Sequence, residues 1–162
     1  MNATARVPTV TASRAAAPAP TAPGIGEPPC EWGLPHRPES AGTARRITQA
    51  VLDAWDTDND ATDQALLVVS ELVTNAIEHA LPPVVLRLAQ RTDTLHIEVD
   101  DGGPAPAKGA RSPDCDPEEH GRGGQIVAQL ATACGTRALP RGTTHWADLP
   151  ATDGARLIAP LP

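Results

Sequence analysis

A long amphipathic segment that ends before two prolines most constrains the fold of this chain. Apolar residues recur at helical spacing over residues 61–79, and Pro82 and Pro83 prevent the helix from continuing. Asp60 or Thr62 is placed to cap its first turn. The stripe consists of Ala65, Val69, Leu72, Val73, Ala76 and Ala80. The pattern predicts a helix with one buried face and a polar edge.

Further helices and strands are expected on both sides of that helix. An earlier helix that Ser40 caps should end at the Asp-rich cluster 56–60, and a later one should run from Gly121 through Cys134 to a closing Gly135. Strands are expected at residues 30–34, 84–88, 95–99, 136–138 and 143–149. This order predicts an α+β fold, a two-layer α/β sandwich in which about three helices cover one face of a mixed, mostly antiparallel sheet.

Composition bears on the partners and the compartment. The chain has 162 residues, which suits one domain, and a formal net charge of −7. Nucleic acids and anionic membranes select for clustered Lys and Arg, so we expect neither as a direct partner. No apolar run approaches the ~20 residues of a membrane span, and no N-terminal segment resembles a signal peptide. Three separated cysteines without a CxxC pair indicate neither a disulfide framework nor a zinc site, so we expect a cytoplasmic protein.

Segments without periodic apolar residues divide the chain. Residues 1–29 are rich in Ala, Pro and Thr and bury too little apolar surface to offset the entropy of ordering, so we expect a disordered leader. A domain at 30–149 and a flexible tail at 150–162 follow. Within the domain, residues 104–120 are rich in Pro, Gly and acidic residues, and a loop of this length inside a domain is usually functional. We interpret it as a lid over a ligand site.

Three polar residues, Glu71, Asn75 and His79, recur every four residues along the edge of the buried stripe. Each one alone is equally well explained as a side chain that flanks the stripe and faces water. Together they suit phosphoryl chemistry, because an amide oxygen at Asn75 can bind Mg²⁺ and a carboxylate at Glu71 can orient or deprotonate a nucleophile. His79 is a candidate phosphate contact, although a histidine at a helix end is commonly a solvated or capping side chain.

The expected strand 95–99 runs into two acids and two glycines, which add further candidates. Strand alternation places Asp101 on the buried face of the strand and Asp100 on the opposite face. A carboxylate on the buried face needs a hydrogen-bond donor, which the exocyclic amine of adenine would provide. Gly103 would let the base approach the backbone closely. An ordinary Asp-Gly turn explains the same residues.

Two glycine-containing segments could contribute phosphate contacts. Gly121, Arg122 and Gly123 open a predicted helix, where backbone N–H groups and the helix dipole favour phosphate binding. A flexible hinge with a solvated Arg122 is the alternative. Thr143 and Thr144 follow a glycine and could add hydroxyl contacts, although strand propensity explains them equally well.

These motifs, in this order, resemble the nucleotide-binding boxes of the GHKL ATPases, a superfamily that includes the catalytic domains of histidine kinases. The motifs are Glu71-x3-Asn75-x3-His79, Val99-x-Asp101-x-Gly103 and Gly121-x-Gly123. Within the superfamily, the small anti-sigma-factor kinases have segments similar to residues 70–80, Leu34-Pro-x-x-Pro-x-Ser40 with Ala44-Arg-Arg46, and Gly142-Thr-Thr-x-Trp146. The resemblance covers about residues 30–149 and implies a Bergerat-type sandwich with ATP between the helices and the sheet.

The resemblance also implies roles for individual residues. Asn75 would bind Mg²⁺, Glu71 would act as a base or orient the nucleophile, and Asp101 would bind the adenine amine. Gly103, Gly121 and Gly123 would shape the pocket. Three positions depart from the family pattern: Gly124 stands where leucine is usual, His145 where valine is common, and Thr143 where lysine is often found.

The implied function is phosphorylation, with ATP and Mg²⁺, of a Ser or Thr on an anti-sigma-factor antagonist, together with control of a sigma factor. The resemblance also allows a homodimer. A nucleotide-gated module that switches its affinity for a protein partner without phosphotransfer is the alternative. The presence of Glu71 favours the enzyme, and the departure at Gly124 favours the module.

Overall fold

The computed structural model describes residues 29–106 and 121–151. Its elements are β1 (Cys30–Leu34), α1 (Ser40–Ala54), α2 (Asn59–His79), β2 (Val84–Arg91), β3 (Thr94–Asp101), α3 (Gly121–Leu130), β4 (Ala133–Leu139) and β5 (Gly142–Pro150). Most of the predicted leader and tail and residues 107–120 of the predicted lid lie outside the described residues. Within the described ranges, no helix has both the length and the apolar character needed to cross a membrane.

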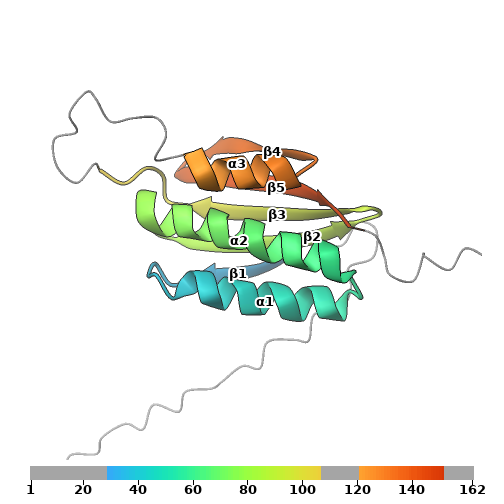
Figure 1. Ribbon diagram of the computed structural model, residues 1–162. Coiled ribbons are helices and arrows are strands. Elements are labelled where there is room, and N and C mark those ends of the chain that lie inside the picture. The colour runs from blue at the N-terminus through green and yellow to red at the C-terminus, as the bar shows by residue number, and fades with distance from the viewer. Residues whose placement is uncertain (1–28, 107–120, 152–162) are drawn as a thin grey trace, which may run out of the picture.

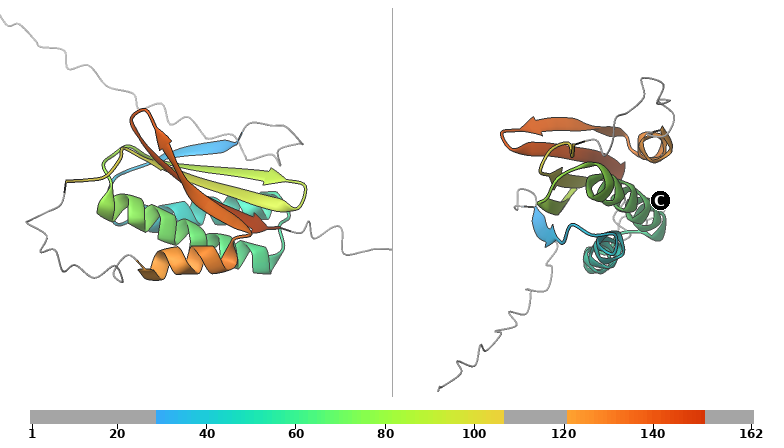
Figure 2. Two further views of the ribbon diagram at one scale, coloured as in Figure 1. Left: turned by 90° about the horizontal axis from the view of Figure 1, so that it is seen from above. Right: turned by 90° about the vertical axis from the view of Figure 1, so that its left-hand side faces the viewer.

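The described strands form one open sheet in the order β1-β2-β3-β5-β4. All four neighbouring pairs of described strands are antiparallel, whereas the sequence allowed a mixed sheet. The three helices lie together on one face of this sheet (Figures 1 and 2). The α+β two-layer sandwich predicted from the element order is therefore confirmed.

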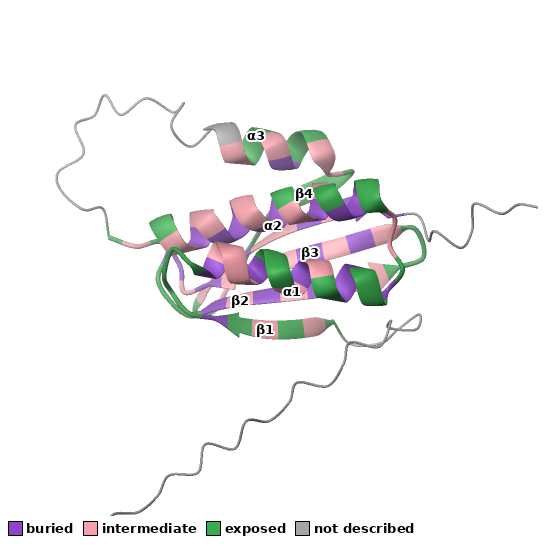
Figure 3. Ribbon diagram, turned by 60° about the horizontal axis from the view of Figure 1, so that its bottom comes forward, coloured by how far each residue is buried: buried purple, intermediate pink, exposed green. Residues whose placement is uncertain are grey.

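The core lies between the inner face of the sheet and α1 and α2. In β3, buried residues alternate with partly exposed ones, as expected for a strand with one face against helices. Every member of the predicted α2 stripe is buried (Figure 3). Because the chain has no Phe or Tyr, aliphatic side chains supply most of the core volume; the largest fully buried ones are Leu52, Leu86, Leu88, Leu95, Ile97 and Leu149.

The predicted caps of α1 and α2 are wrong by one to four residues. Ser40 is the first residue of α1 rather than its cap, and its hydroxyl donates to the carbonyl of Pro35. α2 begins at Asn59, and its cap is Asp58, whose carboxylate accepts a hydrogen bond from Ala61 N at 2.9 Å. The cluster 56–60 contains three Asp and one Asn, so composition alone does not decide which of them adopts the extended conformation that a cap requires.

The prediction that α3 extends to Cys134 is also wrong. The helix ends at Leu130, and Cys134 and Gly135 belong to β4. Gly135 pairs with Trp146 of β5, and a Cβ at Gly135 would lie 3.1 Å from Trp146 Cζ2. The glycine is therefore explained by the indole that packs over it, rather than by a helix terminus.

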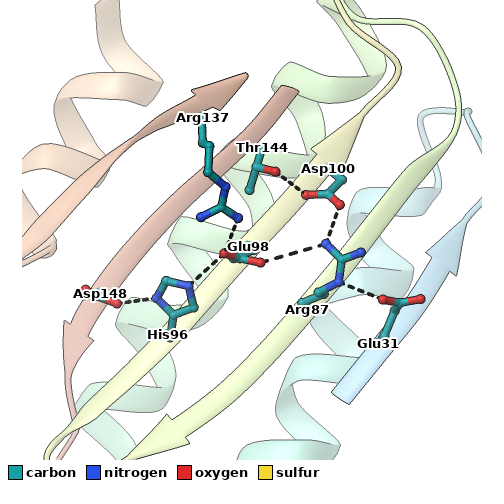
Figure 4. Close-up of polar contacts among 8 residues, drawn as sticks. All are labelled: Glu31, Arg87, His96, Glu98, Asp100, Arg137, Thr144 and Asp148. Atoms are coloured by element: carbon teal, nitrogen blue, oxygen red, sulfur yellow. Dashed lines mark hydrogen bonds and ion pairs between the residues drawn. The ribbon is translucent and has the colours of Figure 1, made fainter. Parts of the chain in front are cut away.

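The face of the sheet turned away from the helices carries a group of polar side chains, which we call the outer-face network (Figure 4). Arg87 of β2 lies between two acids: its Nε is 2.7 Å from Glu31 Oε2, and its Nη1 contacts Asp100. The hydrogen bond to Asp100 is the main reason that the pKa of Arg87 is raised, against the opposing effect of burial. The network consists of Glu31, Arg87, His96, Glu98, Asp100, Arg137, Thr144 and Asp148.

Glu98 at the centre of this network should make stability depend on acid pH. Burial acts to raise the pKa of Glu98, but hydrogen bonds from His96 and Arg137, at 3.1 and 2.9 Å, outweigh it and lower the pKa. A carboxyl group with a lowered folded-state pKa adds stability above its unfolded pKa of about 4.3, and that stability is lost as the pH falls through the folded pKa. We therefore expect unfolding free energies from urea titrations between pH 3 and 6 to fall less steeply with acid in Glu98→Gln than in wild type. Exposed Glu78→Gln is the control, and equal slopes for Glu98→Gln and wild type would contradict the expectation.

Candidate functional site

The polar edge predicted for α2 is present. Glu71 and Asn75 are partly buried beside the apolar stripe, and the side chain of His79 at the helix end is 48% exposed. The first turns of α3 approach this edge at Gly123, where a Cβ would lie 2.3 Å from Glu71 Oε2 and 3.8 Å from Asn75 Nδ2. Any larger residue at Gly123 would displace the Glu71 carboxylate. The fold thus brings together Glu71, Asn75 and Gly123, which are 52 or fewer residues apart in sequence.

Asp101 lies on the inner face of the sheet, as strand alternation predicts. It is only 5% exposed. Its Oδ1 accepts a hydrogen bond from Gly103 N at 2.8 Å, and its Oδ2 lies 3.2 Å from His145 Nε2. Gly103 has a φ of +91°, a conformation that favours glycine over other residues. Asp101 is thus a buried carboxylate at the end of β3 that accepts one backbone hydrogen bond and lies beside the imidazole of His145.

Backbone hydrogen bonds join the end of α2 to the segment that follows β3. Leu81 N donates to Gly103 O at 2.8 Å, and Gly102 N donates to Leu81 O at 2.6 Å. One residue pair further out, Ala105 N donates to His79 O at 2.9 Å. These bonds place the end of β3 beside the last turn of α2. The strand-end candidates therefore lie beside His79, the last of the helix-edge candidates, and we call this end of the sandwich, together with the edge of α2 that leads to it, the site end.

Two glycines are needed at the site end because backbone passes close to them. A Cβ at Gly142, the first residue of β5, would lie 1.9 Å from Asp101 O, and one at Gly102 would lie 2.2 Å from Pro82 O. Gly142 was predicted only as part of a motif, and no role was predicted for Gly102. The sequence signal for Gly102 is its position directly after Asp101, whereas the nearness of Gly142 to Asp101 and both close backbone contacts are visible only in the fold.

The predicted nucleotide contact at Thr144 is not supported by the geometry. Thr144 is fully buried on the outer face, where its hydroxyl donates to Asp100 Oδ1 at 2.6 Å. Thr143 is the residue that pairs with Asp101 in the β3–β5 register and shares its inner face. Strand alternation, which correctly separated Asp100 from Asp101, would have favoured Thr143 if it had also been applied to β5.

His145 is a further residue of the site end that sequence reasoning did not assign to the site. It pairs with Val99 in the register and so lies on the inner face, one strand away from Asp101. Its departure from the family pattern was the only sequence signal.

Of the candidates at the start of the third helix, Gly121 is the first residue of α3. The side chain of Arg122 lies outside the described part of the chain.

The residues of the site end suit an adenine nucleotide. A carboxylate can accept about four hydrogen bonds, and Asp101 accepts one from Gly103 N, so it can also accept one from an amine. The described residues contain no group of three or more His, Cys, Asp or Glu that could hold a metal ion. Mg²⁺ in nucleotide sites usually takes one or two protein oxygens together with phosphate oxygens and water. The amide of Asn75, beside the carboxylate of Glu71, fits that requirement.

The antiparallel sheet, its single helical layer and the polar residues at one end define a class of α+β domains with a ligand site between helices and sheet. The chain belongs to the histidine kinase-like ATPase family, since the model of the histidine kinase-like ATPase domain matches residues 34–147. The predicted GHKL membership is confirmed, and the family implies that ATP is bound.

Among solved structures, the chain is similar to the crystal structure of the RsbU and RsbW domains of Rv1364c from Mycobacterium tuberculosis. The sequences are 19% identical and the TM-score is 0.58, over 77% of this chain and 33% of that chain. This likeness therefore concerns the fold, and the present chain corresponds to about a third of its neighbour. A comparison with curated proteins gives no match.

Proposed function

We propose that this protein is an ATP- and Mg²⁺-dependent serine/threonine kinase of the anti-sigma-factor type. The observation that carries the proposal is the convergence of Glu71 and Asn75 on Gly123, where α3 begins. This arrangement offers a carboxylate, an amide oxygen and a helix N-terminus within one small region. Phosphoryl transfer depends mostly on positioning and on neutralising charge, so these few groups are chemically sufficient.

Each group has a distinct role in the proposed reaction. Bound Mg-ATP would supply the γ-phosphoryl group. Asn75 would ligate the metal through its amide oxygen, and backbone N–H groups of Gly121, Arg122 and Gly123 would contact phosphate oxygens. Glu71 would take the hydroxyl proton of the Ser or Thr as its oxygen bonds to the γ-phosphorus and the bond to the bridging β–γ oxygen breaks, leaving ADP.

The strand-end residues would bind the base. Asp101 would accept a hydrogen bond from the exocyclic amine of adenine, and the glycine backbone at Gly103 would lie beside the ring. His79 at the end of α2 would lie toward the phosphates. The protein substrate would be an anti-sigma-factor antagonist, and a sigma factor would be the second partner; the similarity of residues 70–80 to the small anti-sigma-factor kinases supports both assignments.

One observation favours a second candidate function, nucleotide-gated binding of a partner without phosphotransfer. Gly124 is exposed, and no heavy atom lies within 4 Å of the position where its Cβ would be. The leucine that is usual here in the family is thus replaced by a residue without a side chain, at a position that is open around the Cβ. A glycine makes the first turn of α3 more flexible, which would impair the accurate phosphate positioning that transfer requires more than it would impair binding.

Two measurements with the whole chain test the proposal and separate it from the alternative. Calorimetry with a non-hydrolysable ATP analogue should give binding that is much weaker when EDTA replaces Mg²⁺. Incubation with [γ-³²P]ATP and candidate antagonists encoded near its gene should transfer label to a Ser or Thr of one of them. Binding without labelling of any partner would favour the module, and absence of nucleotide binding would overturn both functions.

A further inference from the structure

Asp100, on the outer face of β3, accepts hydrogen bonds from both neighbouring strands. Nη1 of Arg87 on β2 donates to its Oδ2, and the hydroxyl of Thr144 on β5 donates to its Oδ1 at 2.6 Å. Figure 4 shows the two donors on either side of the carboxylate. Thr144 is fully buried and the side chain of Asp100 is only 14% exposed, so water competes little for these bonds. We call these three residues the cross-strand bridge.

The cross-strand bridge lies at the last residue of β3 that has strand partners on both sides. Asp100 pairs with Val85 of β2 and with Thr144 of β5. The β2–β3 register ends there, and the next residue, Asp101, pairs only with Thr143 of β5. The backbone pairing of the sheet therefore supports Asp101 from one side only. Side-chain bonds at Asp100 act at the point where the second side is lost.

A restraint on Asp100 is also a restraint on Asp101. The two residues share one planar peptide group, and their side chains point to opposite faces of the strand. A twist of the strand end about its axis moves both carboxylates together, so it must stretch the bonds from Arg87 and Thr144. On the inner face, Gly103 N donates to Asp101 Oδ1 at 2.8 Å, so this amide reports where the Asp101 carboxylate lies.

We propose that the cross-strand bridge positions the carboxylate of Asp101 for the nucleotide base. Its members are positioning residues, since they act through the end of β3 and do not touch the nucleotide. The inference rests on the proposed function, in which Asp101 binds adenine. It gives Thr144 an indirect role in the nucleotide site, although its hydroxyl lies on the outer face of the sheet.

A matched pair of variants on β5 separates positioning from stability. Thr144→Val removes a donor to Asp100, and Asp148→Ala removes the carboxylate that contacts His96, four residues further along the same two strands. Both lose one side-chain contact between β3 and β5, so both should be less stable in urea. Only Thr144→Val should weaken the binding of Mg-ATP in calorimetry, by about three- to tenfold, the effect of one hydrogen bond. Thr144→Ser, which keeps the hydroxyl, should recover most of the affinity.

The amide proton of Gly103 gives a second readout, which needs no nucleotide. Its NMR chemical shift depends on the hydrogen bond to Asp101 in the folded protein, and a loss of overall stability does not move it. The Gly103 signal should move in Thr144→Val and in Arg87→Met, and should stay in place in Asp148→Ala. An unmoved signal or an unchanged affinity in Thr144→Val would overturn the proposal, as would equal effects of Asp148→Ala.

The two readouts also distinguish this proposal from the proposed function. Failure of wild type to bind Mg-ATP would overturn the function and, with it, the role of the cross-strand bridge in binding the base. Binding of Mg-ATP by wild type, with the same affinity in Thr144→Val, would remove the role of the cross-strand bridge alone.

Discussion

Replacement of Glu71 by alanine is expected to lower the rate of phosphoryl transfer by about 10²- to 10⁴-fold, the usual contribution of a positioned general base. The carboxylate lies beside Gly123 at the start of α3, so it is placed to act on a hydroxyl near bound phosphate. It is partly exposed and outside the apolar core, and its loss should leave the fold and most of the Mg-ATP affinity intact. A large fall in rate with little change in affinity is the mark of a group that acts mainly in the transition state.

Three variants of α2 make this prediction specific. Transfer of ³²P to the partner gives the rate, and calorimetry gives the affinity. Glu71→Gln keeps the size of the side chain but not its basicity, and should be as impaired as Glu71→Ala. Asn75→Ala should instead lose Mg-dependent binding. Asp63→Ala, which removes an exposed carboxylate from the same helix, is the control and should behave as wild type. Unchanged transfer in Glu71→Ala would remove the general base from the mechanism.

Alanine at Gly142 is expected to destabilise the domain by about 2–6 kcal/mol. The Cβ would lie 1.9 Å from Asp101 O, and the φ of +155° is one that residues with side chains rarely adopt. Relieving the overlap should cost about 1–3 kcal/mol and the backbone conformation a similar amount. Because the clash is with backbone rather than with a flexible side chain, it can be relieved only by separating β5 from the end of β3.

Urea unfolding followed by circular dichroism measures this effect. Gly33→Ala is the matched control, since Gly33 also lies in a strand but has no heavy atom within 4 Å of its would-be Cβ. That substitution should change the unfolding free energy by no more than about 1 kcal/mol. A Gly142→Ala protein as stable as Gly33→Ala would mean that β5 begins differently from the register described above.

Periodicity alone was sufficient to predict the elements with strong alternation. The α2 stripe and the inner face of β3 follow from residue order because each has one buried face and a clear repeat. The strands expected at 84–88 and 95–99 are present within β2 and β3, although β2 continues to Arg91 and β3 already begins at Thr94. The end of α3 was wrong because Cys134 continues a helical repeat that the sheet overrides, and Gly135 there accommodates Trp146 from another strand.

The candidate site residues also fall into two groups: those that the pattern of one element predicts, and those that depend on how the strands pair. Glu71, Asn75 and Asp101 could be predicted because one helix and one strand each fix the direction of their side chains. Thr144 could be placed only by the register of β5 against β3, and the contact between His145 and Asp101 requires the same pairing. A single sequence does not contain that register in any local pattern, since it depends on which strands become neighbours.

The hydrogen bonds between the last turn of α2 and the residues after β3 have a mechanical consequence. Leu81 exchanges backbone bonds with Gly102 and Gly103, and Ala105 is bound to His79. The helix that carries Glu71 and Asn75 is thereby tied to the strand end that carries Asp101. If the residues after β3 move while these hydrogen bonds stay intact, the end of α2 must move with them. Occupancy of the base subsite could then alter the position of the phosphate-side residues without any contact between the two.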